Sequence, residues 1–349
     1  MRATVEQAEA SHAEVILVDN GSTDGSAEFV EQAFPGVVVK RSQHNEGFAG
    51  GANAGVRVAR GNVIVLLNND AVPEEGWLDA LLRALEPEDV TIAASVIDEA
   101  RFPAAYALGT GTISVIGHPI PNVLSDPTSP FYATGTSLAF KRAAFPEPFD
   151  PLFFAYYEDT LLSWRARLRG QRVARAVTSR VRHLGSATAR RQPGQALFYW
   201  ERNKLLTLLL CYERSTLLRL LPLYLFDGVA RLAEEVWLAV RRHPSRPSGL
   251  LGVMDHHGSV LRAIRWLALH PREIGKRRRV VQAERRISDA AITPLLSGKI
   301  FDDHVPTWGH AIGNAVALFY CRLVGIRTAE ELRRKGNALT PALSQRERG

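Results

Sequence analysis

The sequence predicts an α/β protein with a doubly wound, mixed but mostly parallel sheet flanked by helices, followed by an α-helical C-terminal region. Apolar strand patterns and helical patterns alternate through residues 1–190 at the spacing typical of a parallel sheet. Val63–Leu67 has five apolar residues without polar alternation, which is typical of a strand buried on both faces. Residues 191–335 are basic with helical patterns, and residues 336–349 form a polar tail that we expect to be disordered.

Composition and charge limit the partners. The 349 residues are 46% hydrophobic and 23% charged, as in ordinary globular proteins. Residues 1–150 carry 9 Lys and Arg against 20 Asp and Glu, whereas residues 151–349 carry 34 against 16. This asymmetry indicates two surfaces with different partners. The sequence has no recognised nucleic-acid-binding motif, so nucleic acid is not a predicted partner.

Cysteine usage and hydropathy favour a cytoplasmic protein. Cys211 and Cys321 are the only cysteines, and both lie in apolar helical contexts typical of buried thiols. The N-terminus lacks the basic and apolar regions of a signal peptide. No stretch reaches the roughly 20 apolar residues that a membrane-spanning helix needs.

The N-terminal third supplies the first strands and helices in order. Met1–Ala13 is polar without a strand pattern, and Glu14–Val18 is the first predicted strand. A helix is expected from Asp24 to Ala33, and Val37–Val39 is the second strand. A glycine-rich segment then leads into a helix that ends near Arg60.

Asn68, Asn69 and Asp70 follow the buried strand directly. Ligands of parallel sheets bind at the carboxyl ends of strands, so Asp70 lies where chemistry is expected. The alternative is a simple turn, because Asn and Asp are favoured there. Pro73 suits the first turn of the next helix, which is expected to end near Leu85.

The rest of the first region completes the predicted sheet. Residues 100–130, which are rich in Gly, Pro and Ser, are interpreted as an insertion. The expected strands are Val90–Ile97, Tyr106–Val115 (a strand or hairpin), Tyr132–Phe140, Gln171–Ala176 and Thr178–Val181.

Three motifs occur in one order and spacing. They are Val18–Ser26 (VDNGSTDGS), Asn45-x-Gly47 with Asn53, and Leu67–Asp70 (LNND). In this combination the chain resembles the inverting family 2 glycosyltransferases of GT-A fold, and is most similar to their rhamnosyltransferase-like branch. The resemblance covers about residues 14–210. It implies a GT-A fold and a nucleotide-diphosphate sugar as donor.

The resemblance implies a donor nucleotide site made of Asp19, Asn20, Asn45, Gly47, Asn53 and Asn69. Asp19 can accept a hydrogen bond from a pyrimidine N–H, although a turn-forming role is equally open. Gly47 lets backbone approach a ligand before a helix N-terminus. A dinucleotide site is less favoured, because its glycines would follow the first strand.

Asp70 and His183 are the expected metal ligands. By resemblance Asp70 holds Mg²⁺ or Mn²⁺ on the donor diphosphate, and one carboxylate can suffice because phosphates complete the coordination. His183 follows the last strand, where some relatives place a metal- or diphosphate-contacting histidine. A lone histidine without such a role remains equally open.

The acidic pair Glu158 and Asp159 is a further motif that indicates a catalytic site. Aromatic residues precede this acidic pair at the start of a helix. Acids in a first turn ordinarily interact with the helix dipole, but an inverting transfer needs a carboxylate that takes the proton of the acceptor hydroxyl. By resemblance Asp159 is the general base and Glu158 orients the acceptor. Leu161 stands where the family often has another acid.

The resemblance also implies contacts to the donor sugar or acceptor. Thr134, Gly135 and Thr136 match a glycine-containing strand near the donor sugar, and Trp164 follows the acidic pair on the same helix. The alternative for the glycine is that it relieves packing within a strand.

The helical region has two open interpretations. Gln195–Arg242 is expected to be helical with a break near Pro222, and its apolar runs either pack on the catalytic domain or lie in a membrane interface. Basic residues further along, including Lys276–Arg279, favour an anionic membrane surface.

The sequence thus predicts a cytoplasmic glycosyltransferase, peripheral on the inner face of the cell membrane. We expect it to move a sugar such as rhamnose to a saccharide or glycolipid acceptor in cell-surface polysaccharide synthesis. Relatives carry a strand before the position of Glu14, so we also expect exposed sheet edges. The alternative is an inactive, truncated remnant that binds nucleotides or membranes.

Overall fold

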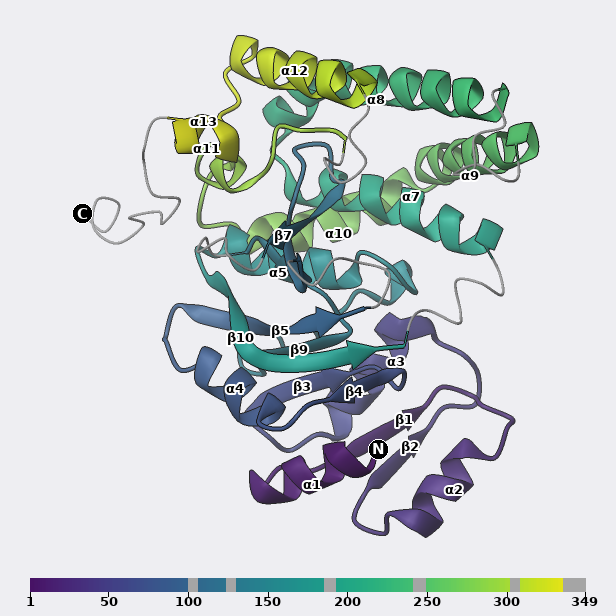
Figure 1. Ribbon diagram of the computed structural model, residues 1–349, viewed down its shortest axis with the longest axis vertical. Coiled ribbons are helices and arrows are strands. Elements are labelled where there is room, and N and C mark those ends of the chain that lie inside the picture. The colour runs from purple at the N-terminus through teal and green to yellow at the C-terminus, as the bar shows by residue number, and fades with distance from the viewer. Residues whose placement is uncertain (100–105, 124–129, 185–192, 241–248, 302–307, 335–349) are drawn as a thin grey trace. The chain divides into compact units, whose positions relative to one another are not determined.

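The computed structural model describes residues 1–99, 106–123, 130–184, 193–240, 249–301 and 308–334 (Figure 1). The chain forms two compact units. The first consists of residues 1–111 and 121–186, and the second of residues 112–120 and 187–349.

A five-stranded sheet forms the centre of the first unit, in the order β3-β9-β5-β10-β4. These strands are Val63–Leu67, Ser137–Lys141, Val90–Asp98, Arg172–His183 and Ala71–Pro73, respectively. β5 and β10 pair in parallel, whereas β9 is antiparallel to β3 and β5, and β4 is antiparallel to β10. Three of the five strands therefore run in one direction, and the predicted α/β class with a mixed, mostly parallel sheet is confirmed.

The prediction that Val63–Leu67 is buried on both faces is wrong. This segment is β3, but it lies at one end of the strand order and only Ile64 is buried. β5 takes the central place instead, and its first eight residues are all buried. The apolar run indicated a strand correctly, but strand order depends on the later segment that forms β9.

Helices cover both faces of the sheet because side chains of β5 alternate between them. Ile92 and Ala94 pack into a cluster with residues of α3 (Gly47–Val58) and α5 (Glu158–Leu168). Ala93 packs on the other side, in a cluster with residues of α4 (Trp77–Ala84). The predicted helix ending near Leu85 is α4. Its end is confirmed, but its predicted start is wrong, because Pro73 is the last residue of β4 and the helix begins at Trp77.

Two further strands form a separate parallel sheet. β1 (Ile16–Asp19) pairs with β2 (Val38–Arg41), and three of its four residues are only partly buried. Within the described residues, β1 and β3 each have a single strand partner, so one edge of each is open. This agrees with the expectation of exposed sheet edges. The polar N-terminus forms a helix, α1 (Arg2–Ala10), and α2 (Ser26–Ala33) follows β1.

Three predicted strands differ from the observed ones. Tyr132–Phe140 is two strands, β8 (Tyr132–Ala133) and β9, and β8 belongs to a small sheet with β6 (Tyr106–Ile113) and β7 (Pro119–Val123). The two strands expected over residues 171–181 form one strand, β10, whose register against β5 shifts after Ala176. Parts of the expected insertion, residues 100–105 and 124–129, lie outside the described residues.

The second unit is largely helical, as expected. Its helices are α7 (Pro193–Cys211), α8 (Arg214–Val240), α9 (Gly249–Leu269), α10 (Pro271–Ala283), α11 (Asp289–Ile292), α12 (Trp308–Leu323) and α13 (Ala329–Arg334). Cys211 and Cys321 are buried free thiols, as predicted. In the described part of the chain, no helix combines the length and apolarity needed to cross a bilayer.

The predicted helix break near Pro222 is wrong. Pro222 lies within α8 on its exposed side, and the chain is interrupted earlier, between Cys211 and Arg214. Buried Leu220 and Leu223 flank the proline and anchor the helix on both sides of it. The packing of these leucines therefore stabilises the helix by more than the loss of the one backbone hydrogen bond that the proline cannot donate.

Candidate active site

The loop from β3 to β4 carries the polar triplet to one end of the sheet. The Asn68 N–H donates to the Thr136 carbonyl at 3.0 Å, and the Leu184 N–H donates to the Asp70 carbonyl at 2.9 Å. These two bonds place Asp70 between the segment before β9 and the end of β10. Asn69 is exposed beside it.

Asp70 and His183 lie next to each other. The antiparallel pairing of β4 and β10 aligns His183 with Ala71, and His183 Nε2 is 3.3 Å from Asp70 Oδ1. His183 Nδ1 is 3.4 Å from Glu99 Oε2. The imidazole thus connects two carboxylates. Sequence reasoning missed Glu99, although its position directly after the buried strand β5 was a usable signal.

The donor set at Asp70 fits a divalent cation that binds together with phosphate. The Asp70 side chain is 30% exposed, so it keeps a face open to a ligand. Among the described residues, no three His, Cys, Asp or Glu side chains are arranged to hold a metal ion. A cation here would take one or two protein ligands, Asp70 and His183, and complete its coordination with water and substrate oxygens.

Asn20, Asn45 and Gly47 are brought together, as the motifs require. Asn20 Nδ2 donates to Asn45 Oδ1 at 3.2 Å and to the Gly47 carbonyl at 2.8 Å. Asn20 Oδ1 accepts from the Glu46 N–H at 2.9 Å, and Asn45 Oδ1 accepts from the Gly47 N–H at 2.8 Å. These bonds fix the loop before α3 against the end of β1.

Gly47 is required where α3 begins. Its φ is +72°, and a Cβ atom there would lie 2.4 Å from the Phe154 carbonyl oxygen. The same oxygen accepts from the Ala49 N–H at 3.0 Å. The first turn of α3 is therefore in direct contact with the backbone that leads to the acidic pair.

Asp19 and Asn53 make contacts within the protein. Asp19 is 8% exposed and its Oδ1 accepts from the Ser22 N–H at 2.8 Å, which is the turn-forming role. Asn53 is buried, and its amide donates to the Phe149 carbonyl at 2.7 Å and accepts from the Phe149 N–H at 3.2 Å. Both amide atoms of Asn53 are therefore engaged by backbone.

Glu158 and Asp159 begin α5 after a strained segment. Phe154, Tyr156 and Tyr157 all have positive φ, between +61° and +70°. Such backbone strain is concentrated at functional sites. Asp159 Oδ2 accepts from the Gly135 N–H at 2.8 Å, and its Oδ1 accepts from the Thr160 N–H at 2.6 Å.

The two carboxyl groups are in different environments. Glu158 is 6% exposed, and within the described residues its Oε2 is buried without a hydrogen-bond partner. Burial, and then the neighbouring Asp159 charge, raise the pKa of Glu158 well above its ordinary value. Burial also raises the pKa of Asp159, while the bonds from Gly135 and Thr160 oppose that shift. Asp159 retains solvent contact and is the more accessible of the two carboxyl groups.

Gly135 and Thr134 lie beside the acidic pair, but Trp164 does not face a site. A Cβ on Gly135 would lie 2.9 Å from the Phe48 ring, and Thr134 Oγ1 is buried without a partner in the described structure. Trp164 is fully buried and packs edge-to-face on Phe131 with ring centroids 5.3 Å apart. The expectation that Trp164 contacts a sugar is corrected, because helical spacing turns this side chain into the core.

Residues 1–145 match the family model described as "Glycosyl transferase family 2". Glycosyltransferase GlyG of Streptococcus pneumoniae serotype 4 (strain ATCC BAA-334 / TIGR4) is 32% identical over 82 residues, which are 23% of this chain and 27% of GlyG. The chain thus aligns with about a quarter of the length of this curated relative.

Two solved structures have some likeness in fold to the chain. S. aureus TarS 1-349 has a TM-score of 0.44 at 13% identity, covering 94% of this chain and 83% of TarS. Mannosyltransferase PcManGT from Pyrobaculum calidifontis, in complex with GDP-Man and Mn²⁺, has a TM-score of 0.42 at 16% identity, covering 90% of this chain and 75% of PcManGT.

Proposed function

We propose that the protein transfers a sugar from a nucleotide-diphosphate sugar to an acceptor hydroxyl with inversion at the anomeric carbon, because residues 1–145 match the model of glycosyl transferase family 2. The observation that carries this proposal is the carboxylate of Asp159. It is held by the Gly135 N–H and by Thr160, and its pKa is raised by burial. Such a carboxylate suits the abstraction of a hydroxyl proton.

In this mechanism Asp159 takes the acceptor proton as the acceptor oxygen attacks. The bonds to Gly135 and Thr160 fix the carboxylate, which reduces the reorganisation needed for proton transfer. Glu158, with its unpartnered Oε2, orients the acceptor or modulates the charge of Asp159. Thr134, Gly135 and Thr136 border the sugar.

Asp70 and His183 would hold a divalent cation, Mg²⁺ or Mn²⁺, when the donor is bound. When bound, the cation stabilises the negative charge of the departing diphosphate. Glu99 orients the His183 ring through the 3.4 Å contact at Nδ1.

The donor nucleotide binds beside the first motifs in this proposal. Asn20, Asn45 and Gly47 shape the loop that receives it. Asn69, which directly precedes Asp70 in the sequence, is exposed. Asp19 and Asn53 act by holding the local backbone, since their polar atoms bind the main chain.

The finer assignment rests on the order of the sequence motifs. We propose a sugar such as rhamnose as the donor group, a saccharide or glycolipid acceptor in cell-surface polysaccharide synthesis, and peripheral association with the inner face of the cell membrane. The basic second unit supports an anionic membrane surface as partner.

The test is turnover by the purified 349-residue chain. dTDP-, UDP- and GDP-sugars are supplied in turn with Mg²⁺ or Mn²⁺, and release of nucleoside diphosphate is measured. The proposal expects one donor to be consumed, chelator to stop the reaction, and NMR of the product to show an inverted anomeric configuration. Retention of configuration would overturn the assignment of Asp159 as base.

A second candidate is a nucleotide-binding protein without transferase activity. The separation of β1 and β2 from the five-stranded sheet favours it, because both motif loops at the donor side begin from these strands. Binding of a nucleoside diphosphate without turnover of any donor would support this candidate.

A further inference from the structure

The outward face of α8 is apolar over most of its length. Seven exposed large apolar residues recur every three or four positions, which places them on one side of the helix. They are Leu218, Leu221, Leu225, Val229, Leu232, Val236 and Val240. This stripe, which we call the α8 stripe, is about 33 Å long at the helical rise.

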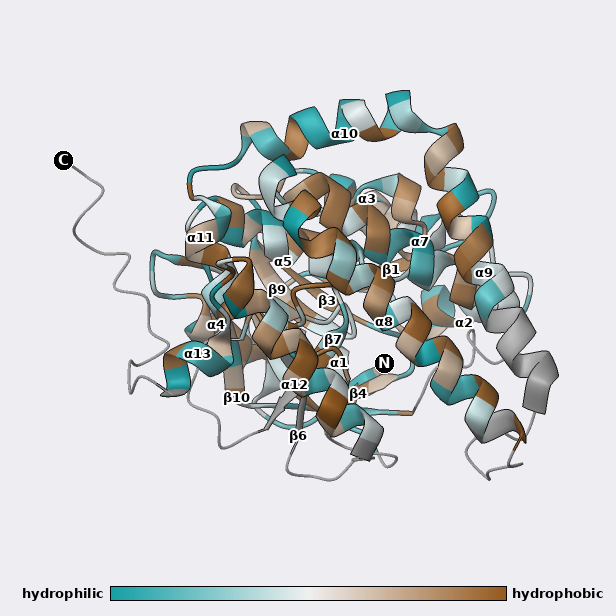
Figure 2. Ribbon diagram, turned by 90° about the horizontal axis from the view of Figure 1, so that it is seen from above, coloured by the Kyte–Doolittle hydropathy of each residue, from teal (hydrophilic) through white to brown (hydrophobic). Residues whose placement is uncertain are grey.

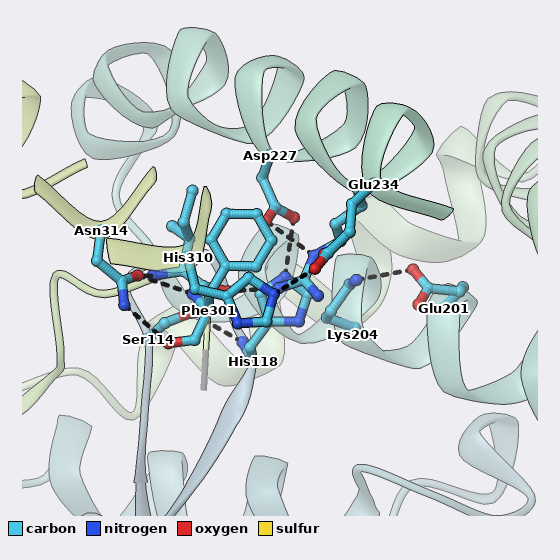
Figure 3. A network of polar contacts seen from close by, with 11 residues as sticks. Ser114, His118, Glu201, Lys204, Asp227, Glu234, Phe301, His310 and Asn314 are labelled. Atoms are coloured by element: carbon cyan, nitrogen blue, oxygen red, sulfur yellow. Dashed lines mark hydrogen bonds and ion pairs between the residues drawn. The ribbon is translucent and has the colours of Figure 1, made fainter. Parts of the chain in front are cut away.

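The opposite face of α8, which packs into the second unit, carries the acidic residues of the helix (Figure 3). Asp227 is buried and binds His118 Nε2 at 2.9 Å and Arg231 at 2.8 Å. Glu234 lies 2.6 Å from His310 Nε2. The helix is therefore inverted relative to an ordinary surface helix, whose charges face water.

α12 repeats this arrangement beside α8. Its exposed residues include Ile312, Val316, Phe319 and Leu323. Two of its polar residues point inward. Asn314 is buried and binds the backbone of Ile300 and Phe301, and His310 pairs with Glu234. The two helices are in contact, and Figure 2 shows apolar residues along both. Together they expose eleven large apolar residues on adjoining helices, and contiguous exposed apolar residues are typical of interaction surfaces.

The charges on this surface have one sign. Among the exposed residues described for α8 and α12, the ionised side chains are Arg214, Arg219 and Arg322, and none is acidic. Arg214 also lines a hollow of about 610 Å³ with basic residues of α10. The other basic residues there are Arg272, Lys276, Arg278 and Arg279. Arg214, which lies one helical turn before Leu218, thus connects the N-terminal end of the α8 stripe with a basic hollow.

We propose that the outward faces of α8 and α12 bind the interfacial region of an anionic phospholipid bilayer. Both helices lie along the membrane surface, and Arg214 and the basic hollow contact lipid phosphates. An interfacial helix requires an apolar face combined with cationic residues, and this surface has both. The charges on the inner face of α8 exclude a spanning orientation for this helix. This inference deepens the membrane association proposed above but does not depend on transferase activity.

The experiment is vesicle flotation of the full chain, with phosphatidylcholine vesicles that contain or lack phosphatidylglycerol. The expected result is binding that is stronger with phosphatidylglycerol and weakens with salt. The double variant Leu225→Glu with Val229→Glu is expected to bind at least about tenfold more weakly. The matched control is Phe29→Glu, which places the same charge on a 65% exposed apolar residue of α2 and is expected to bind as wild type.

A second variant tests the charged end of the surface. Arg214→Glu with Lys276→Glu is expected to lose the preference for phosphatidylglycerol while keeping residual binding to phosphatidylcholine. Trp237, which is 48% exposed on α8, supplies a direct readout. Acyl chains brominated near the headgroup are expected to quench wild-type fluorescence more than that of Trp237→Phe.

Three outcomes would overturn the inference. The first is a wild-type chain that binds no vesicle, and the second is undiminished binding by the Leu225→Glu, Val229→Glu variant. The third is a wild-type dimer in light scattering that this variant dissociates, since the surface would then belong to a second copy of the chain. Flotation uses no donor sugar, so failure here is distinguishable from failure of the transferase proposal.

Discussion

His183 Nε2 lies 3.3 Å from Asp70 Oδ1. Asp70 follows β3 and His183 is the last residue of β10, and these two strands are far apart in the sequence. β4 makes the link, because it follows Asp70 directly and pairs with the end of β10. The second carboxylate at the same imidazole is Glu99, at the end of β5. A carboxylate on the far nitrogen fixes the tautomer and orientation of a metal-binding histidine.

Glu99→Gln is therefore expected to weaken binding of Mn²⁺ about 10- to 100-fold, and Glu99→Asp less so. The measurement is titration of Mn²⁺ followed by electron paramagnetic resonance, which reports free ion without requiring turnover. Asp98→Asn is the matched control, because Asp98 is the adjacent carboxylate and pairs with Arg180 at 3.2 Å instead. Equal weakening of Mn²⁺ binding by both variants would indicate an effect of lost negative charge near the site, and would contradict a specific role of the Glu99–His183 contact.

Asp70→Ala is expected to remove the metal dependence of donor binding. The reason is that Asp70 is the carboxylate with an open face beside His183. Calorimetric titration of the donor identified by turnover, with and without Mg²⁺, measures the difference. Unchanged metal dependence would contradict the role of Asp70 as ligand.

Asp159→Asn is expected to lower the rate of transfer about 10²- to 10⁴-fold while donor affinity stays near the wild-type value. The asparagine oxygen can still accept from one of the two backbone donors, Gly135 N–H or Thr160 N–H, and the amide nitrogen cannot accept from the other. Single-turnover rates and calorimetric donor titrations separate the two effects. A loss of donor affinity as large as the loss of rate would rule against a base.

Glu158→Gln is expected to stabilise the fold near neutral pH. A carboxyl group whose pKa is higher in the folded chain contributes stability while protonated, and that contribution is lost as pH rises through the folded pKa. The amide carries no charge to bury, so we expect a gain of about 1–3 kcal/mol in the free energy of unfolding near pH 7. The gain is expected to shrink toward about pH 4.

Denaturant unfolding at several pH values measures this effect. Glu147→Gln, at an exposed position, is the control and is expected to change stability little at any pH. A gain that does not depend on pH would contradict a raised pKa for Glu158.

Gly47→Ala is expected to destabilise the first unit by about 3 kcal/mol or more, because it combines a positive φ with a collision. The new Cβ would lie 2.4 Å from the Phe154 carbonyl oxygen. Gly25→Ala separates the two causes, since Gly25 has φ +77° and a Cβ added there would meet no atom within 4 Å. Thermal unfolding is expected to show a much smaller loss for Gly25→Ala. Equal losses of stability in the two variants would mean that the collision with Phe154 adds nothing to the destabilisation caused by the positive φ.

Several site residues were predictable from sequence because the motifs are local. Asn20, Asn45 and Gly47 bond to one another across the loop before α3, and Glu158 and Asp159 open α5 as expected. Trp164 was not predictable, since the same helix turns Asp159 toward Gly135 and Trp164 toward Phe131. Only the packing partners decide which side of a short amphipathic helix faces a site.

The sequence by itself determined the α/β class, the order of the strand-end motifs and the helical nature of the second unit, because periodicity and turn chemistry are local properties. The tertiary structure decided the edge position of β3, the meeting of Asp70, His183 and Glu99, and the inverted orientation of α8. Polar and apolar residues at helical spacing specify an amphipathic helix in either orientation. Which face turns inward follows from long-range partners such as His118 and His310, which pair with the charges of α8.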